Sequence, residues 1–136
     1  MSSSLEAAGE EITEHEEGMR HSELAIKFLR EGEDLVDRGD AIQASEKLYK
    51  AAEEAIKEQA RIHADAKDVY AEAERRGRWN TTLLFKAARI LGREIRHYWD
   101  SAWTLHVEGF HEAKLDLEEV KERLEDVKKL VGSMKS

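Results

Sequence analysis

The 136-residue sequence contains no cysteine and no proline. The first absence excludes several kinds of covalent and metal site, and the second removes the strongest helix breaker. Without cysteine the chain forms no disulfide, thiolate zinc site or iron–sulfur cluster, and it has no cysteine nucleophile. Without proline, and with only eight glycines, little interrupts a helix. Asparagine and glutamine are also scarce (Gln43, Gln59 and Asn80) beside abundant Glu, Lys and Arg, a balance typical of thermophile proteins.

Long apolar runs are missing as well, and none approaches the ~20 residues that cross a bilayer. Residues 1–7 lack the basic and apolar regions of a signal peptide. The net charge of −8 argues against a general surface that coats nucleic acid or anionic lipid. We therefore expect one cytoplasmic domain over residues 1–136, with no membrane contact and no DNA-binding motif.

The residues that are present favour helices packed in a bundle. Apolar residues recur on one helical face over residues 5–36 and again over residues 42–62. Between these stretches, Gly39 suits the left-handed position after a helix, and Asp40 with Gln43 forms a capping box for the next helix. So short a connection predicts a long antiparallel helical hairpin, with residues 1–10 frayed.

Further helices are predicted downstream. A short helix over residues 65–77 precedes another that is N-capped by Asn80, and Gly92 kinks or breaks the latter. An apolar and aromatic stripe follows over residues 95–110, and Asp116 opens a last helix that ends at Gly132. No segment has the alternation of a strand. We predict an all-α bundle of five or six helices.

Basic residues are concentrated between Arg75 and Arg96, where seven of them accompany one acidic residue, so this window carries +6 against −8 for the whole chain. On a helix continuous across Gly92, five candidate ligand-binding residues share about one third of the circumference: Lys86, Arg89, Arg93, Arg96 and His97. Such a stripe favours a phosphate, a nucleotide or RNA. No aromatic platform for single-stranded nucleic acid is evident beside it.

A structural interpretation of the same stripe stays open. Its arginines would then pair with the glutamates of the first helix (Glu10, Glu11, Glu14, Glu16 and Glu17) or with Glu118, Glu119 and Glu122. Pairing of this kind, within one chain or across a dimer, is common on helical bundles.

Two Glu-x-x-His pairs, Glu94/His97 and Glu108/His111, have the spacing that di-iron bundles use on two of their helices. Here they lie on one helical stretch, roughly 21 Å apart at 1.5 Å per residue, so they cannot share a site within one chain. We therefore expect no metal and no cofactor. No nucleophile elbow or triad is present, so no catalytic residue is assigned.

The other histidines and the aromatic residues have simple structural interpretations. His15 and His106 fall on apolar stripes, where a hydrogen-bonded core or interface histidine is expected, and His21 and His63 belong to no cluster. Three aromatic residues at helical spacing fit a core better than a ligand pocket: Trp99, Trp103 and Phe110.

Three segments resemble the archaeal PaREP domain family: residues 38–56, 77–80 and 102–112, of which LHVEGFH at 105–111 is the most specific. The likeness extends over about residues 22–131. It implies a helical fold that is distantly similar to the HEPN superfamily. Members of that superfamily are small bundles, often dimeric, that partner nucleotidyltransferases, bind nucleotides or act as ribonuclease toxins.

The ribonuclease branch of that superfamily carries Arg-x4-6-His, and this spacing is absent before His97, His106 and His111. Arg93 and Arg96 lie near His97 at the wrong separation. The leading hypothesis is therefore a non-enzymatic, homodimeric interaction module that binds a nucleotide, an RNA phosphate or an acidic or nucleotidyltransferase-type protein partner. The candidate residues for binding are the five of the stripe together with His106 and His111.

Two alternatives stay open. The first is a ribonuclease or nucleotide-acting enzyme that uses His97, His106 or His111, with Arg96 as an electrostatic partner of His106. The second is a purely structural dimer that binds no ligand.

Overall fold

A computed structural model describes residues 14–135, and the side chains of residues 20–134. This part of the chain contains six α-helices and no strand, which confirms the all-α prediction. The helices are α2 (Glu14–Asp37), α3 (Ala41–Ile62), α4 (Lys67–Arg76), α5 (Thr81–Leu91), α6 (Arg93–Thr104) and α7 (Leu117–Gly132). A π-helix, η2 (Leu105–His111), and two short 3-10 turns, η1 (Ala64–Ala66) and η3 (Ser133–Lys135), complete the fold. The expected start of the first helix near Leu5 and the frayed residues 1–10 lie outside the described residues.

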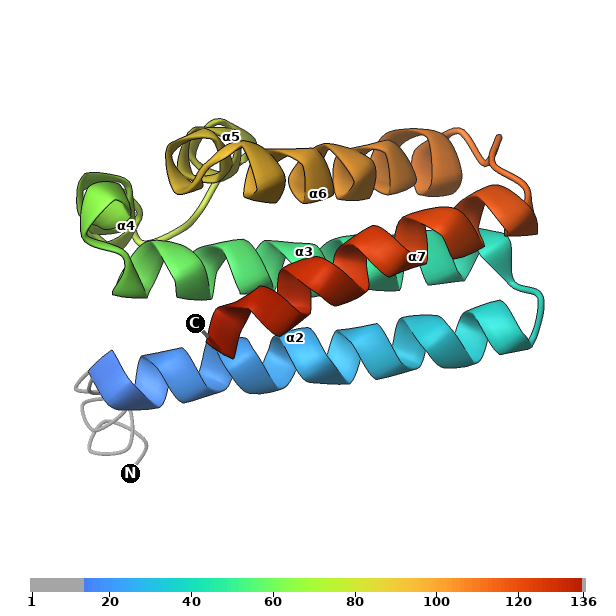
Figure 1. Cartoon of the computed structure of the whole chain (residues 1–136), viewed down its shortest axis with the longest axis horizontal. Coiled ribbons are helices and arrows are strands. Elements are labelled where there is room, and N and C mark those ends of the chain that lie inside the picture. The colour runs from blue at the N-terminus through green and yellow to red at the C-terminus, as the bar shows by residue number, and fades with distance from the viewer. Residues whose placement is uncertain (1–13, 136) are drawn as a thin grey trace, which may run out of the picture.

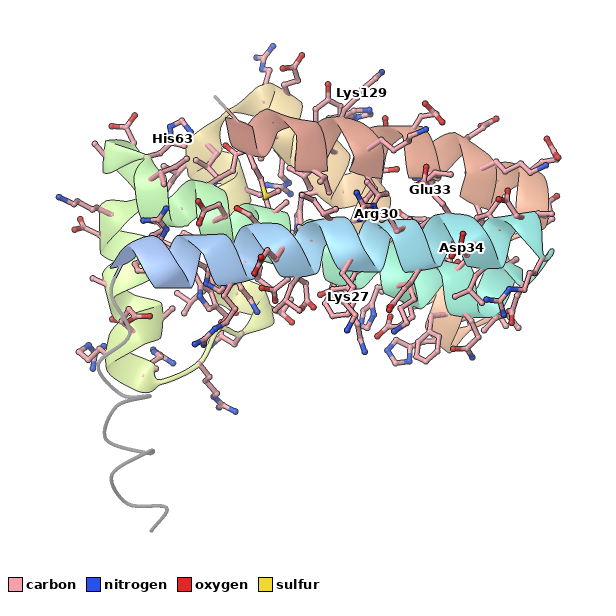
Figure 2. All side chains as sticks on the ribbon, turned by 90° about the horizontal axis from the view of Figure 1, so that it is seen from below. Lys27, Arg30, Glu33, Asp34, His63 and Lys129 are labelled. Atoms are coloured by element: carbon pink, nitrogen blue, oxygen red, sulfur yellow. The ribbon has the colours of Figure 1, made fainter. Side chains whose placement is uncertain are left out.

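The predicted hairpin is formed by α2 and α3, which run antiparallel along each other (Figure 1). Its connection has the expected cap, because the Asp40 carboxylate accepts a hydrogen bond from the Gln43 backbone N–H at 3.0 Å. Ala25 and Val36 of α2 are buried. The outward side of α2 carries exposed charged residues such as Lys27, Arg30 and Asp34 (Figure 2).

Helix α3 is central to the bundle, with α7 crossing the hairpin and α5 and α6 beside it (Figure 1). Half of the residues of α3 are buried, and many of them are alanines, whose small side chains let neighbouring helices approach closely. Trp99 of α6 is the largest fully buried side chain, and its ring packs beside Tyr49 of α3 and Phe85 of α5. No described helix has both the length and the apolar character that a membrane crossing needs.

Gly92 separates α5 from α6. Its φ of 120° and ψ of 169° are far from helical values, and side chains rarely permit that φ. The two helices run in different directions, since α5 is seen end-on in Figure 1 and α6 lengthwise. The continuous helix on which the basic stripe depended is therefore not formed. Lys86 and Arg89 belong to α5, whereas Arg93, Arg96 and His97 belong to α6.

Helix α6 continues into the π-helix η2, which the sequence pattern did not predict. The wider π turn pairs each residue with the fifth one along, and such turns are frequent at functional sites. η2 ends where Ala113 adopts a left-handed φ of 54°. There the Glu112 N–H bonds the Val107 carbonyl at 2.9 Å, and the Lys114 N–H bonds the Glu108 carbonyl at 2.7 Å.

Candidate functional site

His106 of η2 lies against helix α3, where two side chains hold its ring. Its Nδ1 is 2.9 Å from Glu46 Oε1, and an ionised carboxylate only accepts, so Nδ1 carries the proton of this bond. Its ring stacks on Tyr49, with centroids 4.1 Å apart and planes 21° apart. The side chains of His106 and Glu46 are each about one-fifth exposed. The second nitrogen of His106, Nε2, is thereby directed away from α3.

That second nitrogen meets another histidine. His106 Nε2 lies 3.2 Å from His111 Nε2, with the rings nearly perpendicular and their centroids 4.4 Å apart. In an α-helix, residues five apart project about 140° from each other. The π turn of η2 instead brings them to one side. Of the predicted candidates, the structure thus places His106 and His111 in contact.

Aromatic rings extend this cluster along α6. Trp103 lies 5.3 Å from His106 and 5.1 Å from Phe85 of α5, centroid to centroid. Phe85 and Trp103 are partly buried, so their rings retain open surface, whereas Trp99 behind them is fully buried. The guanidinium of Arg96 sits 5.4 Å over the Phe85 ring. We name the connected set Phe85, Arg96, Trp103, His106 and His111 the aromatic face.

The aromatic face corrects one expectation, because an aromatic platform does adjoin a basic residue. Sequence reasoning missed it since Phe85 comes from α5, beyond the Gly92 turn, and Tyr49 comes from α3. The expected core role of Trp99 is confirmed, and Trp103 differs in being only partly buried. The expected core histidine at His106 is hydrogen-bonded as predicted, but it also contacts His111.

The other basic candidates lie elsewhere. Lys86, Arg89 and Arg93 are exposed, and none of them has a carboxylate partner among the described side chains. The expected pairing with α7 is not formed, because Glu118 pairs with Lys121 and Glu119 with Arg123. Pairing with the glutamates of the first helix falls outside the described side chains. His97 is exposed and faces α7, with Nε2 3.8 Å from Asp126 Oδ2.

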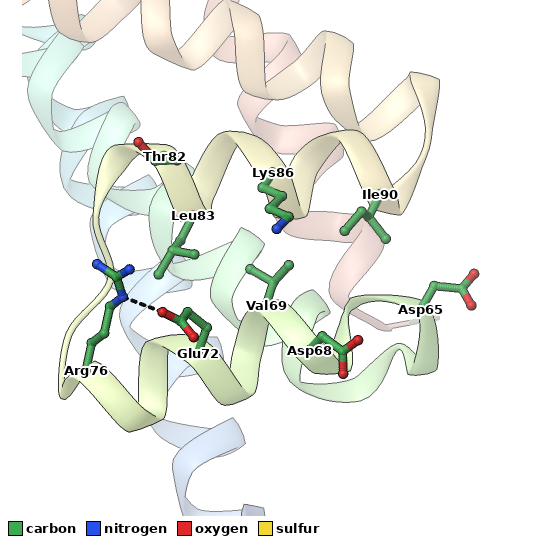
Figure 3. A pocket seen from close by; sticks show the side chains of 9 residues that line it. All are labelled: Asp65, Asp68, Val69, Glu72, Arg76, Thr82, Leu83, Lys86 and Ile90. Carbon is green, nitrogen blue, oxygen red and sulfur yellow. Dashed lines mark hydrogen bonds and ion pairs between the residues drawn. The ribbon is translucent and has the colours of Figure 1, made fainter.

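A separate cavity of about 480 Å³ opens between α4 and α5 (Figure 3). Val69, Leu83 and Ile90 form its apolar surface. Around them lie charged side chains of both signs: Asp65, Asp68, Glu72, Arg76 and Lys86. Hydrogen bonds from Arg75 and Arg76 lower the pKa of Glu72 to about 2, so the acid stays ionised across the physiological range. No pattern in the sequence indicated this cavity.

The surface of α3 beneath His106 is electrostatically unusual. Burial raises the pKa of Tyr49, and the negative charge of neighbouring Glu53 raises it further. Burial likewise raises the pKa of Glu53. Tyr49 therefore stays a neutral hydroxyl that donates to Glu53 and offers its ring to His106.

Comparisons with known proteins agree with the fold. A crystal structure of a protein from Sulfolobus solfataricus has a TM-score of 0.74 at 46% identity, over 82% of this chain and 92% of that chain. A solution structure of the same target has a TM-score of 0.72 at 46% identity, over 82% of this chain and 88% of that one. No curated protein is significantly similar. The model of the archaeal PaREP1/PaREP8 family matches residues 20–131, close to the span that the resemblance predicted, and the chain belongs to this family.

Proposed function

We propose that this protein is a non-enzymatic helical module that binds a ribonucleotide, free or within single-stranded RNA, at the aromatic face. The observation that carries the proposal is the contact between Arg96 and the partly buried ring of Phe85, which packs edge-on against the ring of Trp103. Aromatic rings of this kind stack nucleobases, with about 1–3 kcal/mol for each base. A guanidinium beside them supplies the matching contact to phosphate.

Arg96 is available for that contact. Its present partner is Asp100, at 2.8 Å, and the two side chains are 37% and 52% exposed. An exposed pair of this kind contributes only about 0–1 kcal/mol. A phosphate accepts two parallel hydrogen bonds from a guanidinium and can therefore replace the Asp100 carboxylate.

The histidine geometry favours binding over RNA cleavage. An acid and a base that cleave a phosphodiester lie on opposite sides of the scissile phosphate. The two Nε2 atoms instead face each other 3.2 Å apart, so in this arrangement they do not flank a phosphate. Together with the absent Arg-x4-6-His spacing, this places the ribonuclease hypothesis second.

The proposal is tested by titrating the protein with AMP, ATP and a ten-nucleotide single-stranded RNA while following tryptophan fluorescence. We expect saturable quenching, with Arg96→Ala weakening the affinity about tenfold, as the loss of one charged hydrogen bond predicts. Arg75→Ala is the matched control, because Arg75 also pairs with an acid on its own helix but lies on α4. We expect it to change the affinity less than twofold.

Two outcomes would overturn the proposal: no saturable quenching by any of the three ligands, or equal losses for Arg96→Ala and Arg75→Ala. Binding of AMP and ATP without the oligonucleotide would identify a free nucleotide as the ligand. RNA integrity is followed in the same samples on a gel. Cleavage that disappears in His106→Ala would favour the ribonuclease alternative instead.

The homodimer, the HEPN-like relation, the nucleotidyltransferase-type partner and the cytoplasmic location remain predictions. Ala25 and Val36 of α2 and Trp99 of the aromatic stripe are buried within one chain, so these residues are not available for the dimer contacts that the two patterns suggested. Exposed large hydrophobic residues on the described surface are Ile42, Ile62 and Ile90. Sedimentation equilibrium tests the prediction, and a monomer at all concentrations would contradict it.

A further inference from the structure

The geometry points to a binding site for a divalent transition-metal ion at His106 and His111, with Glu46 as the residue that positions His106. The two histidines belong to the aromatic face, but the nucleotide contacts are proposed for its other members, Phe85, Arg96 and Trp103. The inference does not rest on the proposed function, because the ion is bound by imidazole nitrogens alone. It starts from the 3.2 Å separation of the two Nε2 atoms.

That separation matches two ligands of one tetrahedral ion. With Zn–N bonds of about 2.0–2.1 Å, a nitrogen separation of 3.2 Å corresponds to an N–Zn–N angle of about 100–106°. Such a shared ion places the ring centroids about 5 Å apart, compared with the 4.4 Å observed. His111 is exposed, so its ring has room to turn outward by the difference.

The surroundings of His106 are those of a metal ligand. A ligating histidine almost always donates its other ring N–H to a carboxylate or carbonyl, which fixes the tautomer and raises the basicity of the ligating nitrogen. Glu46 accepts from Nδ1 at 2.9 Å, and stacking on Tyr49 fixes the plane of the ring. The lone pair of His106 Nε2 is consequently held in one direction, toward His111.

The backbone supports the same interpretation. The π turn of η2 brings residues five apart to one side, and π turns are often found at functional sites. Ala113, two residues beyond His111, holds a left-handed conformation that costs an L-residue about 1–2 kcal/mol. The π turn and the left-handed residue Ala113 thus determine the backbone path of the segment that carries the two histidines.

The chemistry of the donors selects the ion. Imidazole pairs suit Zn²⁺, Ni²⁺ and Cu²⁺, whereas Mg²⁺ and Ca²⁺ prefer oxygen ligands. Among the described residues no third His, Asp or Glu completes a cluster of three. The ion would therefore have two protein ligands and keep its other positions for water or an added ligand, compared with three protein ligands in a catalytic zinc site. The Glu-x-x-His spacing in the sequence does not reveal this pair, because the two histidines are five residues apart.

Isothermal titration with Zn²⁺ alone, in chelator-free buffer and without nucleotide, tests the inference. We expect one saturable site, a loss of at least tenfold in affinity for His111→Ala, and a 10- to 100-fold loss for Glu46→Gln, the usual cost of removing such a carboxylate. His63→Ala is the matched control, because His63 is exposed at the end of α3 (Figure 2) and contacts no other histidine among the described side chains. It should bind Zn²⁺ as the wild type does, and Mg²⁺ should produce no binding heat.

Circular dichroism tests whether each variant is folded. His111→Ala should fold as the wild type does, because the side chain of His111 is exposed. A wild type that does not bind Zn²⁺ would overturn the inference. Equal binding by the wild type and His111→Ala would also overturn it, because the ion would then lie at other surface histidines. Nucleotide binding is measured separately, so failure of the metal site and failure of the proposed function are distinguishable.

Discussion

Gly109 of the π-helix lies so close to Ser45 of α3 that a Cβ atom at Gly109 would overlap Ser45 Oγ and lie 2.7 Å from Ser45 Cβ. Ser45 is fully buried, and its hydroxyl donates to the Ala41 carbonyl at 2.8 Å, so it cannot move away without losing that bond. This contact sets the distance between η2 and α3. It thereby places His106 over Glu46 and Tyr49, one and four residues beyond Ser45.

Gly109→Ala should destabilise the protein by about 1–3 kcal/mol, the usual cost of overpacking a buried contact. The change pushes η2 away from α3, so the His106–Glu46 hydrogen bond should weaken as well. Gly132→Ala is the control, because a Cβ there would meet no described atom within 4 Å apart from its own helix backbone and chain neighbours. Urea unfolding measures both variants, and a Gly109→Ala protein as stable as Gly132→Ala would contradict the close contact.

Ala113→Gly should stabilise the protein by about 0.5–1 kcal/mol. Ala113 has a φ of 54°, a conformation that glycine adopts without the steric cost that a Cβ imposes. The matched control is Ala71→Gly on the exposed side of α4, which should destabilise by about 1 kcal/mol because that position is helical. Thermal unfolding of the two variants should therefore shift in opposite directions. A loss of stability in both would show that position 113 is not left-handed.

Local signals predicted much of the fold, and tertiary contacts account for what the sequence did not reveal. Asp40 and Asn80 cap their helices as predicted, because a cap depends only on residues three apart. Whether Gly92 bends or ends a helix depends on the packing of two helices, so the sequence left that choice open.

The aromatic face was missed for the same physical reason. It joins Phe85 and Trp103, which lie on helices of different direction. The His106–His111 contact needs a π turn, and an α-helical periodicity conceals it.

Glu53 and Glu54 should have opposite effects on the pH dependence of stability. Burial raises the pKa of Glu53, so the folded state holds its proton more tightly than the unfolded state does. The free energy of unfolding therefore falls as the pH rises from about 4.5 through the folded-state pKa of Glu53. Glu53→Gln should remove that loss and raise stability at pH 7, because the amide oxygen still accepts from Tyr49.

Glu54 should change the free energy of unfolding with pH in the opposite direction. Burial opposes its ionisation, but hydrogen bonds from His21 and Lys57 outweigh burial and lower its pKa. Its contribution is present above the unfolded-state pKa and is lost as the pH falls through the folded-state value. Glu54→Gln should therefore lower stability at pH 7, by roughly 1.5–3 kcal/mol for the charged hydrogen bonds. Urea unfolding at pH 4 and pH 7 tests both, and equal shifts of one sign would contradict the assignment.

Arg89 and Arg93 lie at the corner between α5 and α6, on either side of Gly92. Charge reversal at these positions distinguishes an effect on ligand binding from an effect on the stability of the fold. Arg89 and Arg93 are exposed and lack carboxylate partners among the described side chains, so Arg89→Glu and Arg93→Glu should change unfolding free energy by less than about 0.5 kcal/mol. Their positive charge still attracts phosphate over about 10 Å at 0.1 M salt. Each reversal should therefore weaken RNA binding a few-fold at low salt and by less at high salt.

Arg96→Glu differs, because Arg96 lies on the aromatic face and contacts Phe85 directly. It should weaken binding by more than tenfold, and that loss should persist at high salt, because it includes repulsion of the phosphate at contact distance. Fluorescence titrations at two salt concentrations compare the three variants. If Arg89→Glu and Arg93→Glu lower binding as much as Arg96→Glu at both salts, the ligand sits at the corner and not on the aromatic face. If they lower the melting temperature instead, these arginines hold the fold together through partners outside the described side chains.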